Sequence, residues 1–164
     1  MDAYRHNHLM FPAEHVRRLH RYDQWANGLT LESLRDVEDG GYSLRMFGHI
    51  LNAQQVWLTR LRRQDSSRVL IWDQPAYRDC AERFEQLASA IREDLDVLTD
   101  SEMDDRISYA NQRGERFENS RFDILVHLFT HSHYHRGQIA AAVRQAGGEP
   151  AATDFIFYVR GHEI

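Results

Sequence analysis

The segment LVHLFTHSHYHRGQIAAAVRQAGG, residues 125–148, combines a helical apolar pattern with four of the chain's ten histidines. On a helical wheel at about 100° per residue, its large apolar side chains fall within one arc of roughly 140°. His135 lies inside this arc and His131 lies at its edge, whereas His133 falls on nearly the opposite side and should face solvent. The pattern therefore predicts a helix that buries one face and carries two imidazole rings toward the core.

Three further long helices are predicted upstream of this segment. Apolar residues recur at three- and four-residue steps after Pro12, and a second, more strongly apolar run continues to about Arg63. Ser43 is expected to be the N-cap of the second helix. Pro75 is expected to open the third helix, which should end near Asp100, because proline suits the first helical turn.

The pattern changes between the third and fourth helices. Residues 105–118 alternate apolar and polar side chains around a turn near Asn111, which predicts a short β-hairpin or an extended loop. Ser120 should begin the fourth helix, glycines at 147–148 should end it, and a last short helix should start after Thr153 or Asp154. Four long amphipathic helices with short connections predict an all-α four-helix bundle, and the length favours one domain over residues 1–164.

Composition excludes several functional classes. The formal net charge of −5 argues against non-specific binding to nucleic acid or to an anionic membrane surface. One cysteine, Cys80, permits no intrachain disulfide, and no apolar run is long enough to suggest a membrane span. The first residues also lack the pattern of a signal peptide. The default expectation is a cytoplasmic protein that binds a small molecule.

The histidines of the fourth helix are candidate metal ligands. His131 and His135 are one turn apart, so both rings can point at one cation, and neutral imidazoles suit divalent first-row metals. A chain of 164 residues with ten histidines is expected to contain about 0.6 pairs of histidines four residues apart by chance. The pair alone is therefore not specific evidence for a metal site. His49, at the edge of the apolar face of the second helix, is the best third ligand, and the neighbouring Gly48 permits close approach of another backbone. His127, one turn before His131 but further from the centre of the apolar arc, ranks third among the histidines of this helix. The alternative is that all are core or half-exposed histidines that hydrogen-bond within the fold.

Four stretches of the chain resemble a known family. They are YDQWANGLTLESL from Tyr22, FGHILNAQQVWLTRL from Phe47, HSHYHRGQIAAAVRQAGGEP from His131 and ATDFIFYVR from Ala152. In this order they are similar to the DinB/YfiT-like superfamily of small bacterial helical proteins, whose most recognisable motif is a histidine, three residues, then His-Arg-Gly-Gln. Together the four stretches span nearly the whole chain.

The resemblance implies a fold and a set of site residues. Members form a four-helix bundle with up-down-down-up connections, usually as homodimers, with a divalent metal between the helices. The metal histidines of the family fall on His49, His131 and His135, the same three that the helical wheels select. The resemblance makes Arg136 a structural or dimer-related residue and Gln138 a candidate pocket group.

The resemblance also implies a class of reaction. Characterised relatives use low-molecular-weight thiols such as bacillithiol or mycothiol in S-transfer or isomerisation. Three histidines would leave one coordination position open, which is typical of catalytic metal sites. The leading hypothesis is a zinc- or nickel-dependent S-transferase with a low-molecular-weight thiol as co-substrate. One alternative is a hydrolase that activates water at the same site. A second is a non-catalytic dimeric module that binds metal or ligand, with His127 or a carboxylate as a fourth protein ligand. A third is a purely structural bundle without metal.

Overall fold

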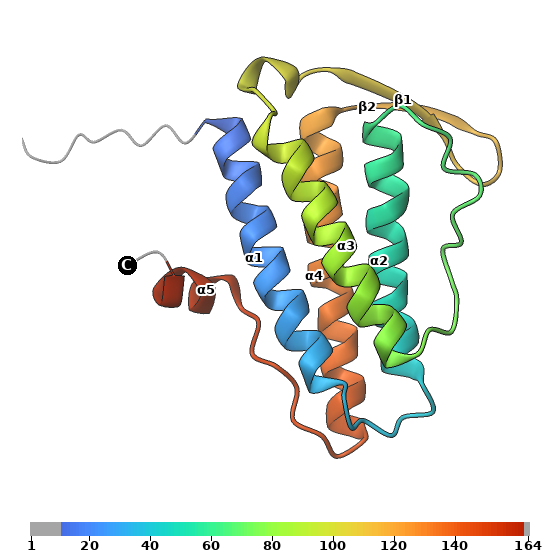
Figure 1. Ribbon diagram of the computed structural model, residues 1–164, viewed down its shortest axis with the longest axis vertical. Coiled ribbons are helices and arrows are strands. Elements are labelled where there is room, and N and C mark those ends of the chain that lie inside the picture. The colour runs from blue at the N-terminus through green and yellow to red at the C-terminus, as the bar shows by residue number, and fades with distance from the viewer. Residues whose placement is uncertain (1–10, 163–164) are drawn as a thin grey trace, which may run out of the picture.

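The structure is a computed structural model, and it describes residues 11–162. Within this range the chain is mostly helical, as expected, with one two-stranded sheet (Figure 1). The helices are α1 (Pro12–Ser33), α2 (Tyr42–Leu61), α3 (Tyr77–Asp96), α4 (Arg121–Gln145) and α5 (Phe155–His162), and a 3-10 turn, η1, covers Asp100–Glu102.

The four long helices pack side by side around one hydrophobic core. Helices α1 and α4 run in one direction and α2 and α3 run in the other (Figure 1). Each of the four long helices packs on two of the other three: α4 packs on α1 and α2, and α3 packs on the same two helices. Fully buried core side chains come from α1, α2, α4 and the hairpin, and include Val16, Phe47, Ile50, Leu51, Ile107, Ile124, Leu128 and Ile139. Helix α2 is buried around most of its circumference, as its apolar content predicts.

The predicted hairpin between the third and fourth helices is confirmed. Strands β1 (Arg106–Ala110) and β2 (Arg116–Ser120) pair antiparallel, with Tyr109 opposite Phe117. The hairpin packs on α2 through β1 and on α4 through β2, at the end of the molecule where α2 finishes and α4 begins (Figure 1). The turn forms because Asn111 Oδ1 accepts hydrogen bonds from two backbone N–H groups and Gly114 adopts a positive φ of 78°.

Helix starts were predicted with mixed success. Ser120 is the N-cap of α4, and its side chain accepts a hydrogen bond from Asp123 N–H, as predicted. Ser43 is not an N-cap: Gly41 is the N-cap of α2, and Ser43 lies inside the first turn, where its N–H donates to Asp39. Pro75 does not open α3 either, because that helix begins two residues later at Tyr77. Helix α3 ends at Asp96, and the turn near residue 100 is the separate element η1.

The loop between α2 and α3 returns along the outside of α2 (Figure 1). Gly48 permits this contact, because a Cβ at that position would lie 2.7 Å from Pro75 Cγ and 3.1 Å from Asp73 Oδ1. The predicted close approach is therefore present, although a proline ring and a carboxylate make it rather than a backbone. Asp73 anchors the loop by accepting from Asn52 and pairing with Arg83 at 2.9 Å. Pro75 thus serves loop packing rather than helix initiation.

Helix α5 packs on α1 through a small aromatic cluster separate from the main core. Tyr22, Phe155 and Tyr158 meet there, with the Tyr22 and Phe155 ring centroids 5.0 Å apart and nearly perpendicular. In the part of the chain that the structure describes, no helix is both long and apolar enough to cross a membrane.

Candidate metal centre

Helices α2 and α4 bring three histidines together. His49 comes from α2, and His131 and His135 come from successive turns of α4. One ring nitrogen of each lies within 4.8 Å of the others, and we call these three residues the histidine cluster. His49 and His135 are buried and His131 is half-buried. Among the described residues, no cysteine, carboxylate or further histidine joins this group.

The spacing of the ring nitrogens suits a shared cation. The Nε2 atoms of His131 and His135 are 3.2 Å apart. Two nitrogens bound to one zinc ion at about 2.0–2.1 Å and near-tetrahedral angles would be separated by about 3.3 Å. The His49 ring completes a triangle, with its centroid 4.6 Å from that of His135 and 5.2 Å from that of His131. The donor chemistry and the spacing therefore both fit a divalent metal.

Two hydrogen bonds fix the ring orientations. His49 Nδ1 lies 3.1 Å from the carbonyl oxygen of Ile71, and His135 Nδ1 lies 2.8 Å from Gln138 Oε1. Because both partners are acceptors, each Nδ1 carries the proton and each Nε2 keeps a lone pair. These lone pairs belong to the two buried members of the histidine cluster. Such outer hydrogen bonds are how proteins usually orient metal-binding imidazoles.

Burial favours the neutral form of two histidines of the cluster, and metals bind imidazole in that form. Burial, together with the neighbouring imidazoles, lowers the pKa of His131 to about 3. Burial also lowers the pKa of His49, although the Ile71 carbonyl acts in the opposite direction. Both rings are therefore neutral at physiological pH, and no proton has to leave them before a cation binds.

The loop after α2 covers one member of the cluster. The Trp72 indole stacks on the His49 ring with centroids 3.9 Å apart and planes within 9°, and Arg45 lies 5.2 Å from the Trp72 ring. Neither Ile71 nor Trp72 was predicted from the sequence. A backbone carbonyl in an irregular loop has no signature in the sequence, and an isolated tryptophan is not distinctive.

The other predicted residues fall at different distances from the cluster. Gln138 lines a cavity of about 600 Å³ beside the C-terminal end of α4, in addition to its hydrogen bond with His135. His127 lies one turn before His131, with ring centroids 5.5 Å apart, and is not part of the cluster. His133 is exposed, as predicted, and its Nδ1 lies 3.2 Å from the Tyr22 hydroxyl.

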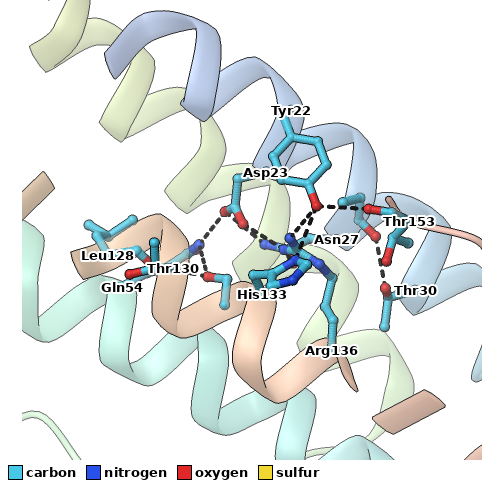
Figure 2. Close-up of polar contacts among 12 residues, drawn as sticks. Tyr22, Asp23, Asn27, Thr30, Gln54, Leu128, Thr130, His133, Arg136 and Thr153 are labelled. Carbon is cyan, nitrogen blue, oxygen red and sulfur yellow. Dashed lines mark hydrogen bonds and ion pairs between the residues drawn. The ribbon is translucent and has the colours of Figure 1, made fainter. Parts of the chain in front are cut away.

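Arg136 directly follows His135 in α4, so its side chain lies about 100° further around the helix axis, where it is buried in a polar network (Figure 2). Its guanidinium pairs with Asp23 at 2.6 Å and donates to Asn27 at 2.8 Å. Gln54 donates to Asp23 at 2.8 Å and to Ser132 at 3.2 Å, so the network joins α1, α2 and α4. We call these five residues the Asp23 network. The sequence carried a signal for it, since Asp23, Asn27 and Gln54 interrupt otherwise apolar helix faces.

The chain's single cysteine lies elsewhere. Cys80 is fully buried in α3, and burial raises the pKa of its thiol to about 11. A protonated and inaccessible thiol does not act as a nucleophile.

Comparison with known proteins agrees with this architecture. The family model of the DinB family matches residues 10–163. The chain belongs to the DinB family. Among solved structures, a DinB-like protein from Bacillus cereus ATCC 10987 is 22% identical, with a TM-score of 0.58 over 83% of this chain and 91% of that one. A comparison with curated proteins finds no match. At this identity the structural likeness supports the fold of this DinB family chain.

Proposed function

We propose that this DinB family protein is a divalent-metal-dependent enzyme that transfers a low-molecular-weight thiol to an electrophilic small molecule. The observation that carries the proposal is the convergence of His49, His131 and His135, with ring nitrogens within 4.8 Å of one another and no fourth ligand among the described residues. Zinc and nickel are the metals we favour, because both accept neutral imidazole ligands. We also interpret the four long helices as an up-down-down-up bundle, which the helix directions in Figure 1 support.

The residues of the protein determine which reactant must supply the sulfur nucleophile. A cation held by three imidazoles would lower the pKa of a thiol at its open position. Because Cys80 is buried and protonated, the sulfur nucleophile must come from a co-substrate. In the transfer, the thiol loses its proton, a carbon–sulfur bond forms, and the leaving group departs with its bonding electrons. A reducing compartment such as the cytoplasm suits this chemistry, since free thiols persist there.

Metal analysis tests the first part of the proposal. Wild-type protein should carry about one zinc or nickel ion per chain, and His135→Ala should lose it. His133→Ala is the matched control, because this residue lies on the same helix but is exposed and outside the cluster. Equal metal content in wild type and His135→Ala would refute a metal centre at this position.

A thiol panel tests the second part. Metal-loaded protein should accelerate conjugation of an electrophile such as an activated aryl halide to a small thiol, above the rate with metal-stripped protein. Turnover of an ester or amide without added thiol would instead support the hydrolase alternative, in which water takes the place of the thiol. Full occupancy by metal with neither reaction would favour the non-catalytic binding module.

We also propose that the chain is a homodimer, as the family resemblance implies. Large apolar side chains on the surface support this proposal: Tyr134 is 64% exposed and Leu70 is 70% exposed. Sedimentation velocity should give twice the mass of one chain, and a mass of 19.3 kDa would contradict it.

A further inference from the structure

A second cavity lies along α4 on the hairpin side of the histidine cluster. Its volume is about 340 Å³, within the range typical of small-molecule sites. Helix α2, helix α4 and the hairpin all contribute to its lining, which consists of Trp57, Tyr109, Asn119, Asp123, Ile124 and His127.

Flat aromatic rings form much of the wall. The Trp57 ring centroid lies 5.1 Å from that of Tyr109 and 5.1 Å from that of His127, and both pairs are nearly perpendicular. Arg60 holds the Trp57 and Tyr109 rings in place, because its guanidinium lies 4.6 Å from each centroid while donating to Ala110 O and Ser66 Oγ. Arg60 is therefore engaged and does not line the cavity. A wall of fixed aromatic rings favours a flat, apolar ligand group.

The polar groups of the cavity favour a hydrogen-bond donor with positive charge. Asp123 is the one formally charged side chain in the lining, and Ser120 donates to only one of its oxygens, Oδ2. Within residues 11–162, no hydrogen bond engages the second Asp123 oxygen or the ring nitrogens of His127. The Asp123 carboxylate attracts an ammonium group through its charge and through a charge-assisted hydrogen bond.

The cavity adjoins the proposed metal centre through His127, whose ring centroid is 5.5 Å from that of His131. We propose that this cavity binds an aromatic ring bearing a protonated amine, and that this group is part of the electrophilic substrate. As a statement about substrate class, this inference rests on the proposed function.

The cavity beside Gln138 is the competing location. It is larger, at about 600 Å³, and Glu38 and Asp39 also make it acidic. Its wall, however, consists mainly of alanine and glutamine side chains with one aromatic residue, Tyr42, and Asp39 already accepts from Ser43 N–H. The aromatic wall therefore favours the cavity at Trp57.

An NMR titration tests the proposal with three probes of one shape: phenethylamine, phenethyl alcohol and hydrocinnamate. The amine should bind with a Kd on the order of millimolar, as expected for so few atoms, and should shift the Trp57 indole and Asn119 amide signals. It should bind about tenfold more tightly than the carboxylate probe, which corresponds to one charge-assisted hydrogen bond. Equal binding of the amine and the carboxylate, or shifts confined to Tyr42 and Gln138, would overturn the proposal.

Matched variants assign the preference to one carboxylate. Asp123→Asn should remove the tenfold preference while keeping a side-chain acceptor at the start of α4. Asp79→Asn is the control, because Asp79 occupies the equivalent position in α3, where it accepts from Ala76 N–H, and lies outside the cavity. An unchanged preference in Asp123→Asn, or equal loss in both variants, would also overturn the proposal.

Titrations of metal-loaded and metal-stripped protein separate the two proposals. If the amine binds at Trp57 but wild-type protein supplied with zinc or nickel takes up no metal at the cluster, the proposed function is refuted and the cavity assignment stands. Metal-dependent thiol transfer with no preference for the amine would refute the cavity assignment and leave the proposed function standing.

Discussion

Helix α4 carries two sets of buried or half-buried polar side chains at adjacent positions, and the two sets differ in the partners of their polar atoms. Ser132 and Arg136 belong to the Asp23 network, in which Arg136 pairs with Asp23 of α1 (Figure 2) and Ser132 accepts from Gln54 of α2, although Arg136 Nε has no partner among the described residues. His131 and His135, one residue earlier in each case, turn their Nε2 atoms toward each other and toward His49.

This difference distinguishes buried polar groups that stabilise the fold from polar groups that are available to bind a ligand. A buried polar group is costly unless a partner satisfies it, so a network with internal partners is explained by folding alone. The histidine cluster is different, because hydrogen bonds to Ile71 and Gln138 use the outer nitrogens of His49 and His135 and leave the inner ones convergent. These convergent nitrogens are the atoms that would hold the proposed cation. The predictions below test this distinction, beginning with the largest effect.

The Asp23 network should dominate stability. Arg136→Met leaves the Asp23 carboxylate buried without its partner, and we expect a loss of about 3–5 kcal/mol of unfolding free energy. Urea unfolding in the presence of EDTA measures it. The double variant Asp23→Leu/Arg136→Met should recover most of this loss, because no isolated charge remains.

His131→Ala, measured in the same assay, compares the contribution of the histidine cluster to stability with that of the Asp23 network. Since His131 is half-buried and forms no ion pair, its removal should cost no more than about 1 kcal/mol in EDTA. A loss as large as that of Arg136→Met would show that the histidine cluster is also a structural element, and the distinction would not hold.

His20 is a third buried polar group, and it should make the protein sensitive to acid. The residue is 4% exposed with both ring nitrogens buried, and burial lowers its pKa from 6.5 to about 4, although the nearby Ala88 backbone acts in the opposite direction. A depressed folded-state pKa contributes stability that is complete above pH 6.5 and is lost as the pH falls toward 4. The shift corresponds to about 3 kcal/mol.

Unfolding at a series of pH values between 7 and 4, with EDTA present, measures this effect. His20→Leu should flatten the pH dependence by that amount. Because His131 also has a lowered pKa, both proteins should be compared in the His131→Ala background. An identical pH dependence with and without His20 would contradict the assignment.

The fold was largely predictable because apolar periodicity reports which helix faces are buried. The helices, the hairpin and the short last helix all follow from it. The helix starts at Ser43 and Pro75 were predicted wrongly, because local rules for caps were overridden by tertiary contacts. Asp39 already binds the Ser43 N–H, and Pro75 packs on the site that Gly48 leaves open.

The candidate site was predictable only in part. Spacing on two helices selected His49, His131 and His135, because ligands on regular elements have a periodic signature. Ile71 and Trp72 belong to an irregular loop whose path depends on the packing of Pro75 against Gly48, and no local pattern encodes that path. The aromatic cavity was missed for a similar reason, since Trp57, Tyr109 and His127 come from three elements.

Replacement of Gln138 should lower the affinity for metal and leave the stability of the fold unchanged. Gln138→Leu removes the acceptor that orients His135, and loss of such an outer partner typically lowers metal affinity about 10–100-fold. Zinc titration by calorimetry measures the affinity, and urea unfolding in EDTA should show little change. Gln145→Leu is the matched control, because Gln145 lines the same cavity without touching His135. Equal affinity in both variants would show that the hydrogen bond does not orient the ring.

The smallest effect should come from the histidine that belongs to neither set. His133 lies between His131 and His135 in the sequence, yet its ring is exposed and contacts the Tyr22 hydroxyl. In His133→Ala that hydroxyl still donates to Thr153 O at 2.7 Å, so unfolding free energy should change by less than about 0.5 kcal/mol. Zinc affinity should match wild type. A large loss of metal from this variant would mean that histidine content, rather than the geometry of the cluster, governs binding, because His133 shares the helix and residue type of the cluster but not its direction.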